Sequence, residues 1–198
     1  MIHPDTELRF ISDTIGYGVV ATKFIPKGTI TWVQDDFDQS FTPENERLLS
    51  PEMRAQLTKY SFTNSKGEKV LCWDNAKYVN HSFRPSCMST AYDFEIAIRD
   101  IQPGEQLTDD YGYLNVEEPF EAEDEGTDRK IVYPDDLLRF HRDWDGMIAQ
   151  NLPEIKKVAQ PLQSYIDEAT WSEFSQVLDA KAELKSILTC YFDPGKNR

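Results

Sequence analysis

The densest group of chemically active side chains lies in the segment Asp74–Cys87, which reads DNAKYVNHSFRPSC. Asn80 offers an amide, His81 an imidazole, Ser82 a hydroxyl and Cys87 a thiol. Such a segment can bind a polar ligand, and it can equally be a polar turn in which Asn80 and Ser82 bond their own backbone. Since His81 and Cys87 lack partners at the spacing of metal ligands, we expect no metal site.

A glycine-containing turn lies upstream. Gly16-Tyr17-Gly18 opens a run that ends in Ile25-Pro26-Lys27-Gly28. Glycine has no β-carbon, so the backbone of such a turn can approach a ligand closely. The pattern lacks the third glycine and the following helix of a dinucleotide-binding fingerprint. By itself it indicates either a ligand-contacting turn or a simple entry into a strand.

A third group lies at Gly104–Tyr113, which reads GEQLTDDYGY. Pro103-Gly104 predicts a turn and Gln106–Thr108 a short strand, which places Tyr111 at the mouth of that strand. A half-buried tyrosine whose hydroxyl binds the backbone would explain Tyr111 without any function. Each group alone therefore permits a purely structural interpretation.

Together, and in this order, the three groups resemble the SET-domain family of protein-lysine methyltransferases. Its members carry a Gly-x-Gly strand and a phrase ending in Ile-Pro-x-Gly, then Asn-His-Ser-x-x-Pro-Asn-Cys, then Gly-Glu-Glu-Leu-Thr-x-x-Tyr. Here the last two read NHSFRPSC and GEQLTDDY, and the resemblance covers roughly residues 6 to 116. It implies a mostly β fold with some helix: the β-clip of small sheets, in which the second and third motifs pass each other in a knot-like crossing.

The resemblance also implies roles for individual residues. The backbone of the Gly16-Tyr17-Gly18 turn would contact the methionine part of S-adenosylmethionine, and Asn80 and His81 would hold its adenosine and amino-acid portions. Tyr111 would be the catalytic tyrosine, in contact with the cofactor and beside a channel for the substrate lysine. Methyl transfer needs a neutral amine, and an apolar channel beside a sulfonium lowers the pKa of lysine by desolvation and charge repulsion.

The sequence departs from the family pattern at three places. Ser86 replaces an asparagine, which is a mild change. Asp109 stands where many members carry an aromatic residue that lines the channel, so the number of methyl groups added stays open. Asp109 could line the channel, or it could face solvent while Tyr113 closes the channel. The family's zinc-binding cysteine cluster has no counterpart, since only Cys190 lies late in the chain.

Patterning divides the chain into three regions. Residues 1–116 hold short β-rich runs and one helical insertion, for which Ser50-Pro51-Glu52 supplies a cap, a proline at the first position and an acid in the first turn. Residues 117–133 hold seven acids and two bases, which is typical of a mobile, solvated loop. The expected strands are Gly18–Thr22, Thr29–Val33, Val70–Trp73, Thr90–Tyr92, Phe94–Ile98 and Gln106–Thr108.

Residues 134–198 predict a C-terminal subdomain of three helices. Apolar residues recur at helical spacing from Leu137 and again from Ile155, Pro161 should break or kink the second helix, and Thr170 has capping-box spacing before the third. We expect either Tyr113–Phe120 or these helices to close the channel in place of the zinc segment. Alternatively, the helices merely cover a sheet or mediate dimerisation.

Charge and cysteine usage restrict the partners. With 35 acids against 21 bases, the net charge of −14 disfavours nucleic-acid binding; it would attract basic partners, or the acids simply keep the protein soluble. The family resemblance implies a lysine-containing substrate, for which a basic protein or tail such as a histone is expected. Three cysteines without a Cys-x-x-Cys pair fit a reducing compartment. No signal-peptide core or membrane span is seen, so we expect an intracellular protein, cytoplasmic by default, with nuclear or host-cell action open. The oligomeric state is open.

Three functions are compatible with the sequence. The leading one is an enzyme that transfers methyl groups to lysine in proteins. The second is a catalytically inactive SET fold that binds peptides, which Asp109 favours and Asn80, His81 and Tyr111 oppose. The third is an interaction protein whose helices carry the function and whose β domain is a scaffold.

Overall fold

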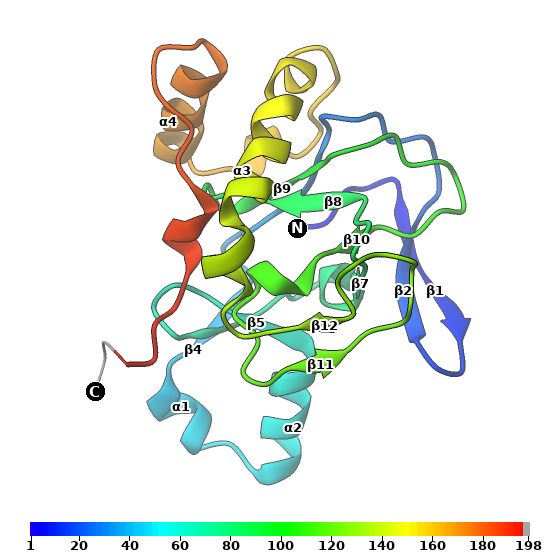
Figure 1. Ribbon diagram of the computed structural model, residues 1–198, viewed down its shortest axis with the longest axis vertical. Helices are drawn as coiled ribbons and strands as arrows, with labels where there is room; N and C mark the ends of the chain where they lie inside the picture. The colour runs from blue at the N-terminus through cyan, green and yellow to red at the C-terminus, as the bar shows by residue number, and fades with distance from the viewer. Residues whose placement is uncertain (196–198) are drawn as a thin grey trace.

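The computed structural model describes residues 1–195 of the chain. These residues form small sheets of two or three strands, with two helices above them and two below in the view of Figure 1. The strands are β1 (Thr6–Ser12), β2 (Gly16–Ala21), β3 (Ile30–Val33), β4 (Gln39–Phe41), β5 (Ser61–Thr63), β6 (Lys69–Leu71), β7 (Asn80–His81), β8 (Cys87–Ser89), β9 (Phe94–Ala97), β10 (Thr108–Asp109), β11 (Phe120–Glu121) and β12 (Ile131–Val132).

The central sheet has the strand order β3-β9-β8, with antiparallel neighbours. All residues of β3 and β9 are buried, which explains why these strands read as short runs without clean alternation. The predicted strands at Thr29–Val33 and Phe94–Ile98 are confirmed. The one at Thr90–Tyr92 is wrong, because that stretch is the turn between β8 and β9, where Asp93 adopts a left-handed φ of 56°.

Strands β7 and β10 bring distant parts of the sequence together. They pair in parallel, with Asn80 beside Thr108 and His81 beside Asp109. The contact continues beyond the strands, since the backbone N–H of Ser82 donates to the carbonyl of Asp109 at 2.8 Å. The second and third sequence motifs therefore lie side by side, as expected from the resemblance.

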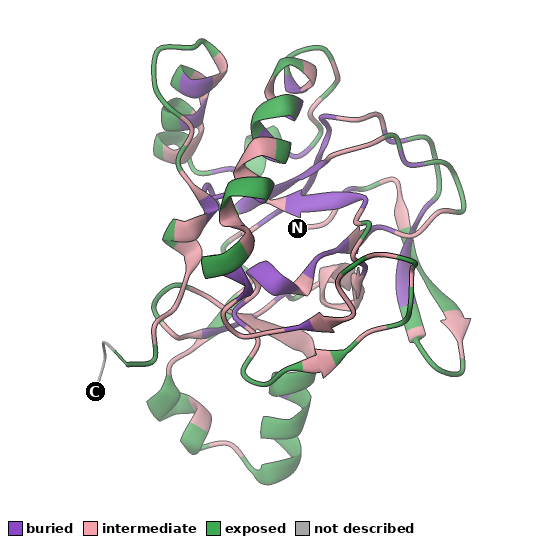
Figure 2. Cartoon of the chain, in the orientation of Figure 1, coloured by how far each residue is buried: buried purple, intermediate pink, exposed green. Residues whose placement is uncertain are grey.

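Helices α1 (Pro43–Arg47) and α2 (Pro51–Tyr60) connect β4 to β5, two strands of the sheet β4-β6-β5. The predicted helix start is confirmed, because the Ser50 hydroxyl accepts a hydrogen bond from the backbone N–H of Met53 at 3.3 Å. Both helices are largely exposed (Figure 2). The end of α2 leads directly into β5 and places Tyr60 beside that strand.

The C-terminal region holds α3 (Asp136–Ile155), α4 (Glu168–Leu178) and two 3-10 turns, η3 (Gln163–Tyr165) and η4 (Ile187–Cys190). The predicted middle helix is wrong, because residues 156–166 form turns. Pro161 disfavours helical backbone at Gln160, whose side chain instead bonds the backbone of Ile30 and Gly28 in the sheet region. The cap of α4 is Asp167, not Thr170.

The C-terminal helices share one hydrophobic core with the central sheet. Phe174 of α4 packs on Tyr92 and Phe94 with ring centroids 4.9 Å apart in both cases, and Trp144 of α3 packs on Tyr113 at 5.3 Å. The helices therefore cover a face of the sheet and have no separate core. No helix in residues 1–195 combines the length and the apolar character needed to cross a bilayer.

The acidic segment 117–133 is anchored at several points, so the expectation of a solvated loop is wrong in part. Its ends pair as β11 and β12. The Glu117 carboxylate bonds the buried ammonium of Lys69 at 2.6 Å. Glu125 accepts hydrogen bonds from the Ser82 hydroxyl at 2.8 Å and the Phe83 backbone at 2.7 Å. The solvated part comprises the exposed acids Glu118, Glu121, Glu123, Asp124 and Asp128.

Candidate active site

Tyr111 lies where the second and third motifs meet. Its backbone N–H donates to Nδ1 of His81 at 3.1 Å, and its hydroxyl donates to the carbonyl oxygen of Val79 at 2.6 Å. The rings of His81 and Tyr111 are 5.4 Å apart. These contacts follow from the parallel pairing of β7 with β10, because Tyr111 begins the 3-10 turn η2 (Tyr111–Tyr113) just after β10.

The glycine turn joins the same neighbourhood through Asn80. The Asn80 amide donates to the carbonyl of Tyr17 at 3.1 Å and to the side-chain oxygen of Gln106 at 3.0 Å. A β-carbon at Gly18 would lie 2.4 Å from Gln106 Oε1 and 2.7 Å from Asn80 Nδ2. A side chain at position 18 would therefore have to displace the ends of the Gln106 and Asn80 side chains. Gln106, assigned from the sequence only to a strand, is the additional member of this group.

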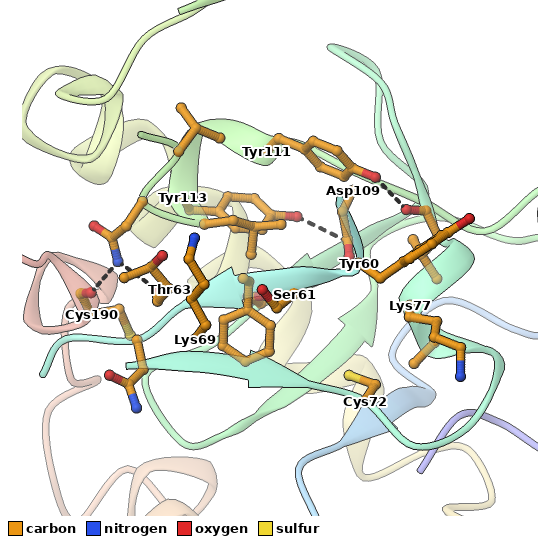
Figure 3. Close-up of a pocket in the computed structure, with 18 of the residues that line it drawn as sticks. Tyr60, Ser61, Thr63, Lys69, Cys72, Lys77, Asp109, Tyr111, Tyr113 and Cys190 are labelled. Atoms are coloured by element: carbon orange, nitrogen blue, oxygen red, sulfur yellow. Dashed lines mark hydrogen bonds between the residues drawn. The ribbon is translucent and has the colours of Figure 1, made fainter. Parts of the chain in front are cut away.

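Tyr111 also lines a cavity of about 580 Å³ (Figure 3). Its walls come from Tyr60–Ser65 around β5, from Tyr113–Glu118 after the tyrosine, and from the central sheet. Tyr111, Asp109 and Tyr113 line it, whereas the residues expected to hold the cofactor do not: Gly16, Tyr17, Gly18, Asn80 and His81. Tyr111 therefore contacts His81 and lines the cavity, and the glycine turn is joined to this neighbourhood through Asn80.

Two segments were expected to close the substrate channel, Tyr113–Phe120 and the C-terminal helices, and they contribute unequally to the cavity wall. Seven residues between Tyr113 and Phe120 line the cavity, while Cys190 is the one residue from the described range 134–195 that does so. The segment after the tyrosine therefore contributes far more of the cavity wall than the described C-terminal region does. The C-terminal helices contribute indirectly, because Trp144 of α3 packs against the ring of Tyr113, which lines the cavity.

The protonation states of Tyr111 and His81 follow from burial. Burial raises the pKa of the Tyr111 phenol, and the nearby acidic groups of Asp109 and Glu95 raise it further, so the hydroxyl keeps its proton. Burial lowers the pKa of His81 although Asp110 and Glu125 oppose this. The neutral imidazole accepts a hydrogen bond at Nδ1, which assigns its proton to Nε2. This buried nitrogen has no hydrogen-bond partner within residues 1–195.

Asp109 is buried in the cavity wall, with 4% of its surface exposed. The alternative in which it faces solvent is therefore wrong. The Tyr113 hydroxyl donates to Asp109 Oδ1 at 3.0 Å, as the dashed line in Figure 3 marks. Glu95 of β9 lines the same cavity and is also buried. Sequence reasoning missed Glu95, although a lone acid inside the apolar strand Phe94–Ala97 was a signal that could have found it.

Comparison with known proteins identifies this arrangement. Residues 16–112 match the family model of the SET domain. The chain belongs to the SET-domain family. The chain is similar in structure to a Plasmodium falciparum protein provisionally assigned as a histone methyltransferase, with 20% sequence identity, coverage of 56% of this chain and 95% of the other, and a TM-score of 0.41. No curated protein gives a significant match to the chain.

SET domains are generally protein-lysine methyltransferases that use S-adenosylmethionine. Two observations fit such a cofactor here. A β-carbon at Gly16 would meet nothing within 4 Å, so the backbone of the turn is uncovered there. His81, whose neighbour Asn80 bonds the turn, carries a proton on Nε2 that has no acceptor within residues 1–195. Within the described residues, no group of three or more His, Cys, Asp or Glu side chains could hold a metal ion.

Proposed function

We propose that this SET domain transfers methyl groups from S-adenosylmethionine to the side-chain amine of lysine in a basic protein. The observation that carries the proposal is the position of Tyr111. Tyr111 bonds His81, whose neighbour Asn80 bonds the Gly16-Tyr17-Gly18 turn, and Tyr111 also lines a cavity large enough for a side chain. A transfer enzyme needs a residue in contact with both sites, because donor and acceptor must meet at one reacting centre.

The cavity suits a lysine side chain. Aromatic rings and the stems of longer side chains form most of its surface, and a cavity of this size falls within the range of small-molecule sites, about 300–1,000 Å³. Free lysine has a pKa of about 10.4, so the neutral amine is scarce at pH 7. Entry into a buried, apolar space lowers that pKa by desolvation. Holding the amine in line with the methyl group supplies much of the remaining acceleration.

Tyr111 and the backbone around it would orient the reacting groups. The Tyr111 hydroxyl is a donor already bonded to the Val79 carbonyl, so that oxygen and the phenol oxygen form a fixed polar pair at the cavity wall. Polarised methyl hydrogens make weak C–H···O contacts with such oxygens. S-adenosylmethionine, when bound, supplies an electrophilic methyl group on a sulfonium. The Gly16-Tyr17-Gly18 backbone, Asn80 and His81 are the residues that would hold it.

The cavity rim suits a basic, extended peptide. Glu117 and Glu118 line the cavity, and Glu121 and Glu123 are exposed on the segment that follows. Their charges would attract Lys- and Arg-rich chains and raise association rates at low salt. Strand β5 stands at the edge of the sheet β4-β6-β5 and lines the cavity. An edge strand is a surface on which an extended peptide can add as another strand.

The test is incubation of the purified chain with radiolabelled S-adenosylmethionine and a mixed basic-protein fraction, followed by mass spectrometry of the labelled lysines. Label transfer by the wild type and a loss of at least about 100-fold in Tyr111→Phe support the proposal. Tyr165→Phe is the matched control, because Tyr165 is an exposed tyrosine in η3, outside the cavity.

Two outcomes contradict the proposal. Undiminished transfer in Tyr111→Phe would remove the tyrosine from the reaction. Peptide binding by the wild type without any transfer would favour the second candidate function, a peptide-binding SET fold without turnover. The buried carboxyl group of Asp109, in place of an aromatic channel residue, is the observation that keeps this candidate under test.

A further inference from the structure

Two carboxyl groups without a cationic partner lie together in the cavity wall. Asp109 from β10 and Glu95 from β9 are 4% and 8% exposed, and both line the cavity. The Tyr113 hydroxyl bonds Asp109, and the Ser89 hydroxyl bonds Glu95, each at 3.0 Å. Among residues 1–195, neither carboxyl group forms an ion pair. Uncompensated buried carboxylates are costly, so this pair needs an explanation.

The two groups share one proton at neutral pH. Burial raises the pKa of Glu95 far above its ordinary value, and the adjacent Asp109 charge raises it further. Burial raises the pKa of Asp109 to about 6, although hydrogen bonds from Glu95 and Tyr113 oppose the rise. Glu95 is therefore the protonated donor and Asp109 the ionised acceptor. The cavity wall carries about one negative charge.

The titratable phenols and thiols around this charge are neutral, and two other charged groups act on the pair. Tyr111 and Tyr113 keep their phenol protons, and the thiols of Cys72 and Cys87 keep theirs, because burial raises the pKa of all four groups. The remaining charges that act on the pair are those of Asp110, which adds to the negative potential, and the chain's amino terminus, which opposes it.

Lys69 does not neutralise the pair. Its ammonium group is buried in the same cavity but bonds Glu117 at 2.6 Å. The negative charge on Asp109 thus stays available to a ligand. A buried carboxylate walled by the rings of Tyr60, Tyr111 and Tyr113 is a binding site for an organic ammonium, since the carboxylate accepts its N–H bonds and the ring faces attract its charge.

We propose that Asp109 binds the ammonium group of the substrate lysine and accepts its proton before methyl transfer, while Glu95 holds Asp109 in place by donating a hydrogen bond. In this step an N–H bond of the ammonium breaks, an O–H bond forms on Asp109, and the freed electron pair remains on nitrogen as the nucleophile. The proton leaves Asp109 for solvent after the product departs. This inference rests on the proposed function and assigns its general base.

The first experiment measures binding without a methyl donor. Two peptides of equal sequence, one with lysine and one with norleucine at the target position, are titrated into the protein at pH 7.5. We expect the wild type to prefer lysine, and Asp109→Asn to lose at least about tenfold of that preference, because only the carboxylate pairs with the ammonium. Equal preference in both proteins would overturn the proposal.

The second experiment compares pH profiles of kcat. The wild-type rate should rise up to about pH 6–7 and then level, because ionised Asp109 is the proton acceptor. Asp109→Asn should be at least about 100-fold slower at pH 7 and should gain about tenfold per pH unit up to pH 9, as the free amine becomes available. An unchanged profile in Asp109→Asn contradicts the proposal.

Two further variants make the result specific. Glu95→Gln retains a neutral donor to Asp109, so its rate should depend on pH as that of the wild type does, even where the rate itself falls. A loss in Glu95→Gln equal to that in Asp109→Asn would assign the base function to the pair instead and overturn the role given to Asp109. Asp143→Asn, an exposed carboxylate on α3, is the control for a change of one charge.

The outcomes separate this inference from the proposed function. If the wild type transfers no methyl group, the proposed function fails whatever Asp109 does. If the wild type is active and Asp109→Asn, folded by circular dichroism, keeps both its lysine preference and its profile, the assignment of Asp109 alone fails.

Discussion

Arg129 connects Asp110, the residue before Tyr111, to the start of the C-terminal helices. Its guanidinium pairs with Asp110, next to Tyr111, and with Asp136 at the start of α3 at 2.6 Å. The side chains of these two aspartates are 3% and 1% exposed. The guanidinium also lies over the rings of Phe83, Phe140 and Trp144, at 4.6 to 5.7 Å from their centroids.

Replacing Arg129 with methionine keeps an apolar side chain against the rings but leaves two buried carboxylates without a cation. Removing one partner of a buried pair costs about 3–5 kcal/mol. We therefore expect Arg129→Met to lower the free energy of unfolding by about 4 kcal/mol, a large share of the 5–15 kcal/mol of a typical domain. With a urea m-value of about 2 kcal/mol per molar, the midpoint falls by about 2 M.

The assay is equilibrium urea unfolding followed by circular dichroism. Arg139→Met is the matched control, because Arg139 pairs with Asp135 on the surface of α3 with both side chains nearly half exposed, and such a pair contributes about 0.5 kcal/mol. Adding Asp136→Asn to Arg129→Met should restore part of the lost stability. A loss below about 1 kcal/mol in Arg129→Met, or one equal to that of Arg139→Met, would refute the reasoning.

Three further outcomes are expected. Gly18→Ala should displace the Asn80 amide and weaken S-adenosylmethionine binding at least about tenfold in calorimetry. Gly146→Ala is the control, because a β-carbon there meets nothing within 4 Å. Equal affinities of the two variants would contradict this prediction. Since burial raises the folded-state pKa of both Asp109 and Glu95, the free energy of unfolding should fall as pH rises from about 4 to 7, and in urea titrations Asp109→Asn should make this fall smaller by about 3 kcal/mol. A fall in Asp109→Asn as large as that of the wild type would contradict a raised pKa at Asp109. A triple variant, Glu118→Gln, Glu121→Gln and Glu123→Gln, neutralises three exposed acids. It should reduce the salt dependence of kcat/KM on a lysine-rich peptide. An unchanged salt dependence would show that these acids have no role in attracting the substrate.

The meeting of the three motifs could be predicted from the sequence, whereas several of its supports could not. The order and spacing of Gly16, Asn80 and Tyr111 identified a family pattern, and the parallel pairing of β7 with β10 agrees with it. Gln106 and Glu95 escaped notice because a residue's neighbours across a sheet depend on strand pairing, which local patterns do not reveal. Close packing around Gly18, for example, becomes visible only once Gln106 lies against it.

The helical region shows a second limit. Apolar spacing correctly predicted α3, but the same spacing after Ile155 did not produce a helix. Backbone preferences before Pro161 and the hydrogen bonds of Gln160 to the sheet decide the path there. Arg129 likewise looked like one base in a solvated acidic loop. Its partners stand 19 and 7 residues away, at spacings that carry no local signal.

The interpretation of Asp109 from the structure differs from the interpretation based on the sequence alone. As a carboxylate in place of an aromatic channel residue, it favoured an inactive fold. In the structure it is buried beside Glu95, and replacing such a pair with apolar residues is often neutral or stabilising. A cavity that only binds peptide side chains through apolar contact would gain nothing from keeping the two carboxyl groups. A cavity that must strip a proton from an ammonium needs an acceptor whose pKa lies near the working pH, and burial of Asp109 next to a protonated glutamic acid produces one.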